Sequence, residues 1–168
     1  MIKLWRKFCY THTMHIKIDD LQGTEIHALL QEHLRHMAQL SPPASVHALD
    51  IHALRQSDIT FWTAWSDQQS SAQLLGCGAL KQLDALHAEL KSMRTDAAHL
   101  KKGVAQAILS HILQVAQQRG YKRISLETGP AQTFAPAHSL YAKNGFSYCG
   151  PFTDYTLDPF SVFMTRVV

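Results

Sequence analysis

The chain has 168 residues, of which 46% are hydrophobic and 17% are charged, with 16 Lys and Arg against 13 Asp and Glu. This length fits one domain with a sizeable core, and this composition excludes a disordered chain. No apolar run reaches the ~18 residues that a membrane span needs, and the small basic surplus is dispersed rather than clustered, so we expect a soluble protein without a membrane or nucleic-acid partner.

The cysteines and the first residues bear on the compartment. Cys9, Cys77 and Cys149 are odd in number, widely spaced and without a CxxC pair, which predicts reduced thiols and a cytoplasmic protein. Residues 1–13 lack the apolar stretch of a secretory signal. They are either a loosely attached extension or precede a natural start at Met14, and the sequence leaves both open. We therefore assign residues 14–168 to a single domain.

The first third of the chain predicts a strand and then a long helix. Ile16 and Ile18 alternate with polar residues, as in a short strand. Asp20 stands where the N-cap of an amphipathic helix over 21–38 belongs. The helix must end before Pro42 and Pro43, since proline cannot continue it.

Three extended apolar runs follow and predict an antiparallel meander. After a short helix at 50–56, they span 59–65, 74–83 and 88–95. The polar segment 66–71 and a turn near Asp84 connect them.

The most regular helix is predicted after this meander. Apolar residues between Val104 and Val115 share one face, and Gly120 is placed to end the helix. An apolar strand over 123–127 follows directly, so strand, helix and strand form a unit with parallel strands. The remaining elements are a helix over 137–144 and strands over 146–149 and 161–167. The expected fold class is therefore α/β, with a mixed sheet.

The segment 99–105 (HLKKGVA) joins the meander to this helix and is the first candidate binding site. Backbone N–H groups of a helix's first turn lack partners and carry a partial positive charge, and together they bind phosphate. Lys101 and Lys102 add charge, and Gly103 lets the backbone come close. An ordinary basic loop with a glycine turn fits the spacing equally well. The segment matches neither GxxxxGK[ST] nor GxGxxG.

Three segments in order, 89–95 (ELKSMRT), 99–105 (HLKKGVA) and 140–146 (LYAKNGF), resemble signatures of the GNAT superfamily of acetyl-CoA-dependent N-acetyltransferases. The resemblance runs from about Met14 to the end of the chain. It implies a GNAT-like fold, in which a mostly antiparallel central sheet has one splayed parallel strand pair and flanking helices.

The resemblance implies that acetyl-CoA is the co-substrate. The family's pyrophosphate loop falls on Leu100, Lys101, Lys102, Gly103, Val104 and Ala105. Leu100 departs from the family's Gln or Arg and offers no side-chain donor. The backbone of Met93, Arg94 and Thr95 would pair with the pantetheine arm like an added strand, and its N–H groups would polarise the thioester carbonyl. The splayed gap would lie between the strands of Met93 and Leu126.

Tyr141 matches the family's tyrosine that reprotonates the departing CoA thiolate. A phenol carries a proton at neutral pH, so this role as general acid is chemically sound. The alternative is a core tyrosine with its hydroxyl bonded to backbone. The asparagine that the family often has seven residues earlier is replaced by Phe134.

A general base must take a proton from the acceptor's ammonium before it can attack. Glu89 is the first candidate, because it lies on the strand that leads to the cofactor loop, and Glu127 at the end of the next strand is the second. Partial burial in a cleft would raise the pKa of the Glu89 carboxyl. The alternative for both is an exposed carboxylate paired with a lysine.

The histidines predict no metal site. His12 with His15 and His47 with His52 are the pairs to consider, but neither stands with a Cys or carboxylate cluster and no HExxH occurs. The acceptor pocket is expected to draw on the first helix and the first two meander strands. These elements supply His33, Met37, Phe61, Trp62 and Trp65. Because side chains alternate along a strand, only one of its faces reaches the cleft, either the face of Phe61 and Trp65 or the face of Trp62.

The sequence thus predicts a single-domain N-acetyltransferase that transfers acetyl to a primary amine of a small molecule or peptide. A non-catalytic acyl-CoA-binding module is the alternative, since Leu100 and Phe134 depart from the family pattern. A nucleotide-binding protein is a third interpretation. A homodimer stays open.

Overall fold

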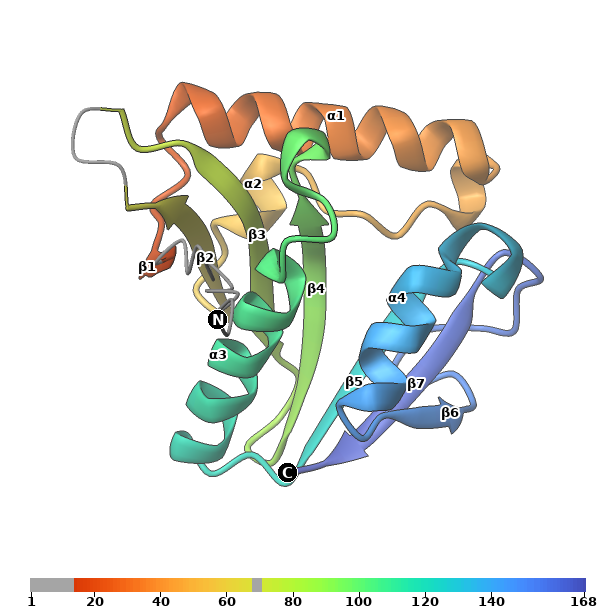
Figure 1. The fold of residues 1–168 in the computed structure, drawn as a ribbon. Helices are drawn as coiled ribbons and strands as arrows, with labels where there is room; N and C mark the ends of the chain where they lie inside the picture. Colours follow the sequence, from red (N-terminus) through yellow and green to blue (C-terminus); the bar gives the residue numbers. More distant parts are fainter. Residues whose placement is uncertain (1–13, 68–70) are drawn as a thin grey trace, which may run out of the picture.

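The computed structural model describes residues 14–67 and 71–168, and its seven strands form one sheet in the order β1-β2-β3-β4-β5-β7-β6 (Figure 1). The strands are β1 (Met14–Ile18), β2 (Ile59–Ser66), β3 (Leu74–Gln82), β4 (His87–Thr95), β5 (Arg123–Thr128), β6 (Ser147–Cys149) and β7 (Val162–Val167). The helices are α1 (Thr24–Leu40), α2 (Ile51–Leu54), α3 (Val104–Gln118) and α4 (Ala131–Lys143), with short 3₁₀ turns at Pro43–Ser45 and Ala97–His99. The α/β fold with a mixed sheet is confirmed.

The first helix begins later than predicted. α1 starts at Thr24 with Gly23 as its N-cap, so the assignment of Asp20 to that position is wrong. Asp19 and Asp20 instead accept the backbone N–H groups two residues on, and Leu21 takes a positive φ of 61°. These side chains favour a local turn over a cap, which delays the helix by one turn.

The predicted meander is confirmed, and a bulge interrupts its last strand. β2, β3 and β4 pair antiparallel, and the Asp84 carboxylate holds the turn before β4 by accepting from two backbone N–H groups at 2.8 Å. The β3–β4 register shifts between Cys77 and Ala79, opposite Ser92, which has a φ of 53°. A Cβ at Gly78 would lie 2.7 Å from the Met93 sulfur and 2.9 Å from an Ile108 methyl group, so a larger residue opposite the bulge would have to displace these side chains.

The parallel strand pair that the strand–helix–strand unit predicts is β4 with β5, and it covers only part of both strands. Pairing runs from His87 with Arg123 to Leu90 with Leu126 and stops there, although both strands continue. In Figure 1 the two strands converge at the bottom and diverge upward, with α3 and α4 on either side of the opening and α1 across its top. The sheet therefore has a splayed gap where the sequence predicts it.

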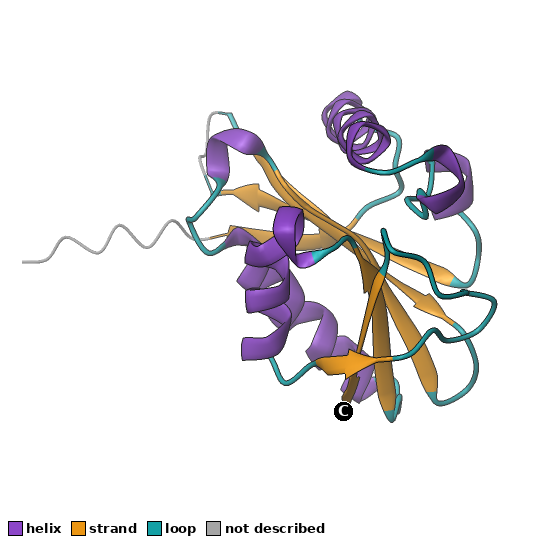
Figure 2. Cartoon of the chain, turned by 90° about the vertical axis from the view of Figure 1, so that its right-hand side faces the viewer, coloured by secondary structure: helices purple, strands orange, loops and turns teal. Residues whose placement is uncertain are grey.

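Helices lie on both faces of the sheet in the turned view of Figure 2, and two hydrophobic clusters pack them against it. One cluster packs α3 on the sheet and includes Trp62, and the other packs α1 and α2 on the sheet and includes Phe61. Both side chains are buried. Alternation along β2 sends neighbouring side chains to opposite cores, which removes them from any cleft.

The fourth helix is longer than predicted and contains a kink. It begins at Ala131 rather than 137, and Phe134 within it is non-helical (φ −111°, ψ 22°). Pro136 lies in the first turn after the kink, where its missing N–H costs no helical hydrogen bond. The prediction for residues 1–13 lies outside the described residues. None of the described helices has the length and apolar content to cross a membrane.

Candidate active site

A cavity of about 120 Å³ opens where β4 and β5 part. Its walls come from the second half of β4, the end of β5, α4, the C-terminal half of α1 and the segment between α1 and α2. Of the predicted site residues, Met93, Glu127 and Tyr141 line this cavity, which we call the transfer cavity. His33 and Met37 of the predicted acceptor pocket line it as well.

Glu127 is the carboxylate of the transfer cavity. It occupies the first β5 position beyond the last pair with β4, and the Ser161 hydroxyl donates to its Oε1 at 2.8 Å. Burial raises the pKa of the Glu127 carboxyl above its ordinary value, while the Ser161 hydrogen bond, His47 and Lys91 act in the opposite direction. A buried carboxylate with a raised pKa is suited to accept a proton.

Tyr141 faces the same cavity from α4. Its ring is 7% exposed and packs at an angle against Phe146, with 5.8 Å between the ring centroids. Burial, and then the nearby Glu127, raise the pKa of the Tyr141 hydroxyl well above that of a free phenol. The hydroxyl therefore keeps its proton at neutral pH, as a general acid requires.

The wall beside Tyr141 depends on close packing between Gly129 and Phe134. A Cβ on Gly129 would lie 2.1 Å from the Phe134 ring, so the ring rests directly on the backbone after β5. The His138 ring also bonds the Gly129 carbonyl, with 2.8 Å between Nε2 and the oxygen. Phe134, which stands where the family often has asparagine, thus gives the transfer cavity an apolar wall.

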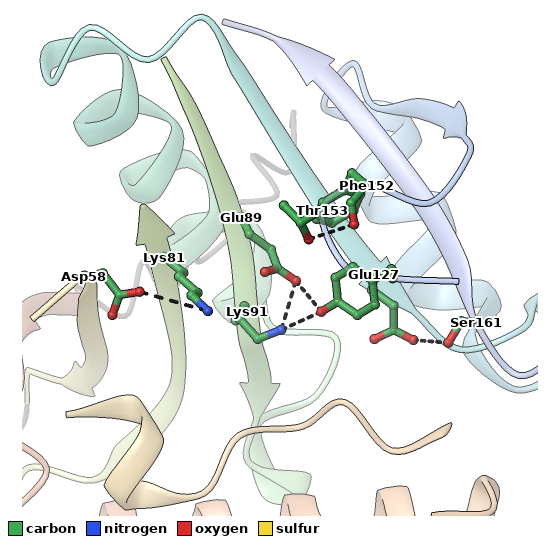
Figure 3. Close-up of polar contacts among 9 residues, drawn as sticks. Asp58, Lys81, Glu89, Lys91, Glu127, Phe152, Thr153 and Ser161 are labelled. Atoms are coloured by element: carbon green, nitrogen blue, oxygen red, sulfur yellow. Dashed lines mark hydrogen bonds and ion pairs between the residues drawn. The ribbon is translucent and has the colours of Figure 1, made fainter. Parts of the chain in front are cut away.

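Glu89 lies in a different environment from Glu127. Its Oε1 accepts the Tyr155 hydroxyl at 2.6 Å and the Lys91 ammonium at 2.9 Å, and Lys91 also donates to the Tyr155 oxygen at 2.9 Å (Figure 3). Glu89 lines a second cavity of about 570 Å³ and not the transfer cavity. Lys91 and His47 line both cavities and so stand between them.

The predicted cofactor residues on β4 lie beside the gap. Met93 lies in the bulge, Arg94 and Thr95 follow it, and all three come after the last β4 residue that pairs with β5. Backbone groups on that edge are free to pair with an extended ligand. The Arg94 side chain turns to α1, where it donates to Glu32 at 2.7 Å.

The predicted phosphate loop lies at the N-terminus of α3. Gly103 is the N-cap residue with a φ of 82°, and Lys101 has a φ of 59°. A Cβ on Gly103 would meet nothing within 4 Å, so the backbone here is open to a close approach. Leu100 is exposed, Val104 is the first residue of α3 and is buried in the core, and Ala105 is the second residue of the helix. None of these loop residues lines either cavity.

The remaining predicted candidates lie elsewhere. Trp65 of β2 donates from its indole to Thr63 at 2.8 Å and lines neither cavity. His47 lines the transfer cavity, while His52 lies in α2; His12 is outside the described residues. Among the described residues, no group of three or more His, Cys, Asp or Glu could hold a metal ion. Burial, then Arg94, lowers the pKa of His33 to about 4, so this ring is neutral at pH 7.

Sequence reasoning missed four residues of this region: Lys91, His47, Tyr155 and Ser161. Both Tyr155 and Ser161 belong to the connection between β6 and β7. The sequence presents the segment of Tyr155 as a plain loop and places Ser161 at the start of the last strand. The aromatic side chains between Pro151 and Pro159 were the available signal for Tyr155. Their partners are distant in the sequence: Tyr155 and Glu89 are 66 residues apart.

Comparison with protein families matches residues 24–146 to the Acetyltransferase (GNAT) family. YsnE of Bacillus subtilis (strain 168), described as an uncharacterized N-acetyltransferase, is 56% identical over 153 residues, covering 91% of this chain and 99% of YsnE. YedL of Escherichia coli (strain K12), described in the same words, is 52% identical over 150 residues, covering 89% of this chain and 92% of YedL.

Solved structures share the fold. An acetyltransferase from Streptococcus agalactiae superposes with a TM-score of 0.69 at 20% identity, covering 92% of this chain and 98% of that one. A Bacillus subtilis acetyltransferase in complex with CoA superposes with a TM-score of 0.62 at 17% identity, covering 93% and 99%. The chain belongs to the GNAT family and is an acetyl-CoA-dependent acyltransferase.

Proposed function

We propose that this chain transfers the acetyl group of acetyl-CoA to a primary amine of a small molecule or peptide, with Glu127 as general base and Tyr141 as general acid. One observation carries this assignment: both side chains line the cavity at the splayed end of the parallel pair, and Glu89 does not. Between the two carboxylates that the sequence offers, the geometry favours Glu127.

The residues on the donor side fit acetyl-CoA. The unpaired edge of β4 after the bulge would hold the pantetheine arm through its backbone, and the open backbone at Gly103 would hold the pyrophosphate. Lys101 and Lys102 would add positive charge to that end. The loss of a donor at Leu100 removes one side-chain contact and leaves the backbone contacts in place.

The chemistry follows from the opposite protonation states of the two groups. The ionised Glu127 carboxylate takes a proton from the incoming ammonium, and the freed amine attacks the thioester carbonyl carbon. Backbone N–H groups of β4 would stabilise the oxygen's developing negative charge. The C–S bond then breaks, and the Tyr141 hydroxyl gives its proton to the CoA thiolate and later recovers one from the new amide nitrogen.

The acceptor would enter between the α1–α2 segment and the β6–β7 connection. His47 and Lys91 line both the transfer cavity and the larger second cavity, so a bound amine can extend from one into the other. Neutral His33 and Met37 form the opposite wall. The reacting end must be small, because the transfer cavity is only about 120 Å³.

Tyr141→Phe tests this function most simply. The variant should lower kcat by about tenfold or more, while the Kd for acetyl-CoA stays within about twofold, because the hydroxyl acts on the leaving thiolate. CoA thiol release with a panel of primary amines measures the first, and calorimetric titration with acetyl-CoA measures the second. Unchanged turnover would remove Tyr141 from the mechanism.

We also propose a reducing, cytoplasmic location. Both cysteines that the structure describes, Cys77 and Cys149, are free thiols, and burial raises the pKa of Cys77 to about 12, which keeps it unreactive.

A further inference from the structure

Glu89, Lys91 and Tyr155 form a closed triad of side chains that lines the second cavity, and Lys91 lines the transfer cavity as well. The Glu89 carboxylate accepts from Lys91 and Tyr155, and Lys91 donates to Tyr155 as well, so each member contacts both others. The Lys91 and Glu89 side chains are only 9% and 4% exposed. The Lys91 ammonium also lies 5.6 Å from the centre of the Tyr155 ring. A buried ion pair of this kind persists only where further hydrogen bonds satisfy it, and Tyr155 supplies them.

The triad also connects the two sides of the gap. Tyr155 and Ser161 belong to the β6–β7 connection; Tyr155 bonds Glu89 on β4, and Ser161 bonds Glu127 on β5 (Figure 3). The Tyr155 ring meets the edge of His47, with 5.0 Å between ring centroids. Glu89 and Glu127 are thus held by one connection on neighbouring strands, yet only Glu127 lines the transfer cavity.

The groups that face Glu127 come from every element packed around it. Glu89 and Lys91 lie on β4, His47 on the α1–α2 segment, Tyr141 on α4, and Ser161 and Tyr155 on the β6–β7 connection. Lys91 and Glu89 act on the Glu127 carboxyl in opposite directions, the cation lowering its pKa and the anion raising it. Because the two charges are bonded to each other, their effects on the Glu127 carboxyl oppose each other.

We propose that Lys91 is a positioning residue for acetyl transfer: its ammonium, held by Tyr155, occupies the Glu89 carboxylate and leaves Glu127 as the carboxylate that meets an incoming ammonium. Without Lys91, Glu89 would be a second buried carboxylate able to hold the acceptor away from the transfer cavity. The negative charge of Glu89 would also disfavour the ionised form of the Glu127 carboxyl. The inference rests on the proposed role of Glu127, and Lys91 acts through that residue without touching the reacting atoms.

Direct titration of the carboxyl groups tests the proposal without an acceptor. The chain has four glutamates, Glu25, Glu32, Glu89 and Glu127, so the side-chain carboxyl carbons of 13C-glutamate-labelled protein give a spectrum that single variants assign. Glu127→Gln identifies the signal of interest. Its chemical shift followed against pH in the full chain gives the titration midpoint.

Three variants form a double-mutant cycle, in which the two single variants should shift the Glu127 titration midpoint in opposite directions. Lys91→Gln should move the Glu127 midpoint to higher pH, Glu89→Gln should move it to lower pH, and the double variant should return it toward that of the wild type. A midpoint that stays in place in both single variants, or moves the same way in both, overturns the proposal. Glu89→Gln keeps the shape of the side chain, so this arm decides alone if Lys91→Gln does not fold.

Two further variants separate charge from packing. Lys91→Arg keeps the cation and should leave the midpoint in place. Lys81→Gln removes a lysine of β3 that lies 4.0 Å from Asp58 and lines only the second cavity, and it should also leave the midpoint in place. A shift with Lys81→Gln as large as with Lys91→Gln would overturn the specific role of Lys91.

The outcome is distinguishable from a failure of the proposed function. If Glu127→Gln retains full turnover, the base assignment fails, whatever the titrations show. If Glu127→Gln abolishes turnover but the Lys91 and Glu89 variants leave the Glu127 midpoint unmoved, only the positioning role of Lys91 fails.

Discussion

The part of this site that would hold acetyl-CoA, the donor end, is formed by backbone groups, whereas the part that would hold the amine, the acceptor end, is formed by side chains. The donor end consists of backbone from two short runs, β4 after its bulge and the loop before α3, and one of its few special requirements is the left-handed conformation of Gly103. The acceptor end consists of side chains from β4, β5, α4 and two connections, joined by hydrogen bonds across as many as 66 residues. A local run of sequence can encode the first, whereas only the complete fold assembles the second.

The largest effect should come from breaking the acceptor end alone. Glu127→Gln removes the proposed base and should lower kcat by about 100-fold or more, with little change in the Kd for acetyl-CoA. Rapid measurement of CoA thiol release and calorimetric titration check the two halves of this prediction. A variant that loses acetyl-CoA binding in proportion to turnover would show that the two ends are not separate.

The same variant has a predicted effect on stability with a definite sign. Because the folded-state pKa of Glu127 is raised, the folded chain binds the carboxyl proton more tightly than the unfolded chain does. Wild-type stability should therefore fall as the pH rises from the ordinary glutamate pKa through the raised one. Glu127→Gln should lack this fall and unfold at a higher temperature than the wild type at pH 7, which thermal unfolding at several pH values would check.

A smaller effect is expected from breaking the donor end. Gly103→Ala places a Cβ on a residue with a φ of 82°, which costs about 1 kcal/mol of backbone strain and brings a methyl group to the phosphate side. The Kd for acetyl-CoA should rise severalfold, while kcat at saturating acetyl-CoA changes little. Gly150→Ala is the matched control, since its Cβ also meets nothing within 4 Å but its φ is not positive. Equal effects of the two variants would contradict the assignment.

The smallest effect should come from adding a binding group for acetyl-CoA at the donor end. Leu100→Gln restores the side-chain donor that the family has at this position, on an exposed residue whose packing is not at risk. One added hydrogen bond to a charged group should lower the Kd for acetyl-CoA by up to about tenfold. Affinity that stays at the wild-type value would mean that backbone groups alone bind the pyrophosphate.

The same comparison explains what the sequence could predict. The meander, α3 and the parallel pair follow from periodicity and from helix and turn signals that lie within a few residues, and the gap in that pair follows from the resemblance to the family. The errors have local physical causes. Asp20 bonds the backbone of a turn instead of capping α1, and a kink at Phe134 lets α4 begin before Pro136.

The acceptor end could be predicted only in part. The sequence offers Glu89 as the first candidate base and Glu127 as the second, and nothing local says that Lys91 and Tyr155 occupy the first while the second lines the transfer cavity. Phe61 and Trp62 are aromatic and so fit an acceptor pocket by composition, but each is buried in one of the two hydrophobic clusters. These outcomes depend on how strands and connections pack, which periodicity does not encode.

A crystal structure of this chain with CoA tests the central claim most directly. The account predicts that the CoA sulfur lies in the transfer cavity, next to Tyr141 and on the side of Glu127, and that the pyrophosphate contacts the backbone around Gly103. A sulfur atom outside that cavity, or a pyrophosphate bound away from the N-terminus of α3, would contradict it.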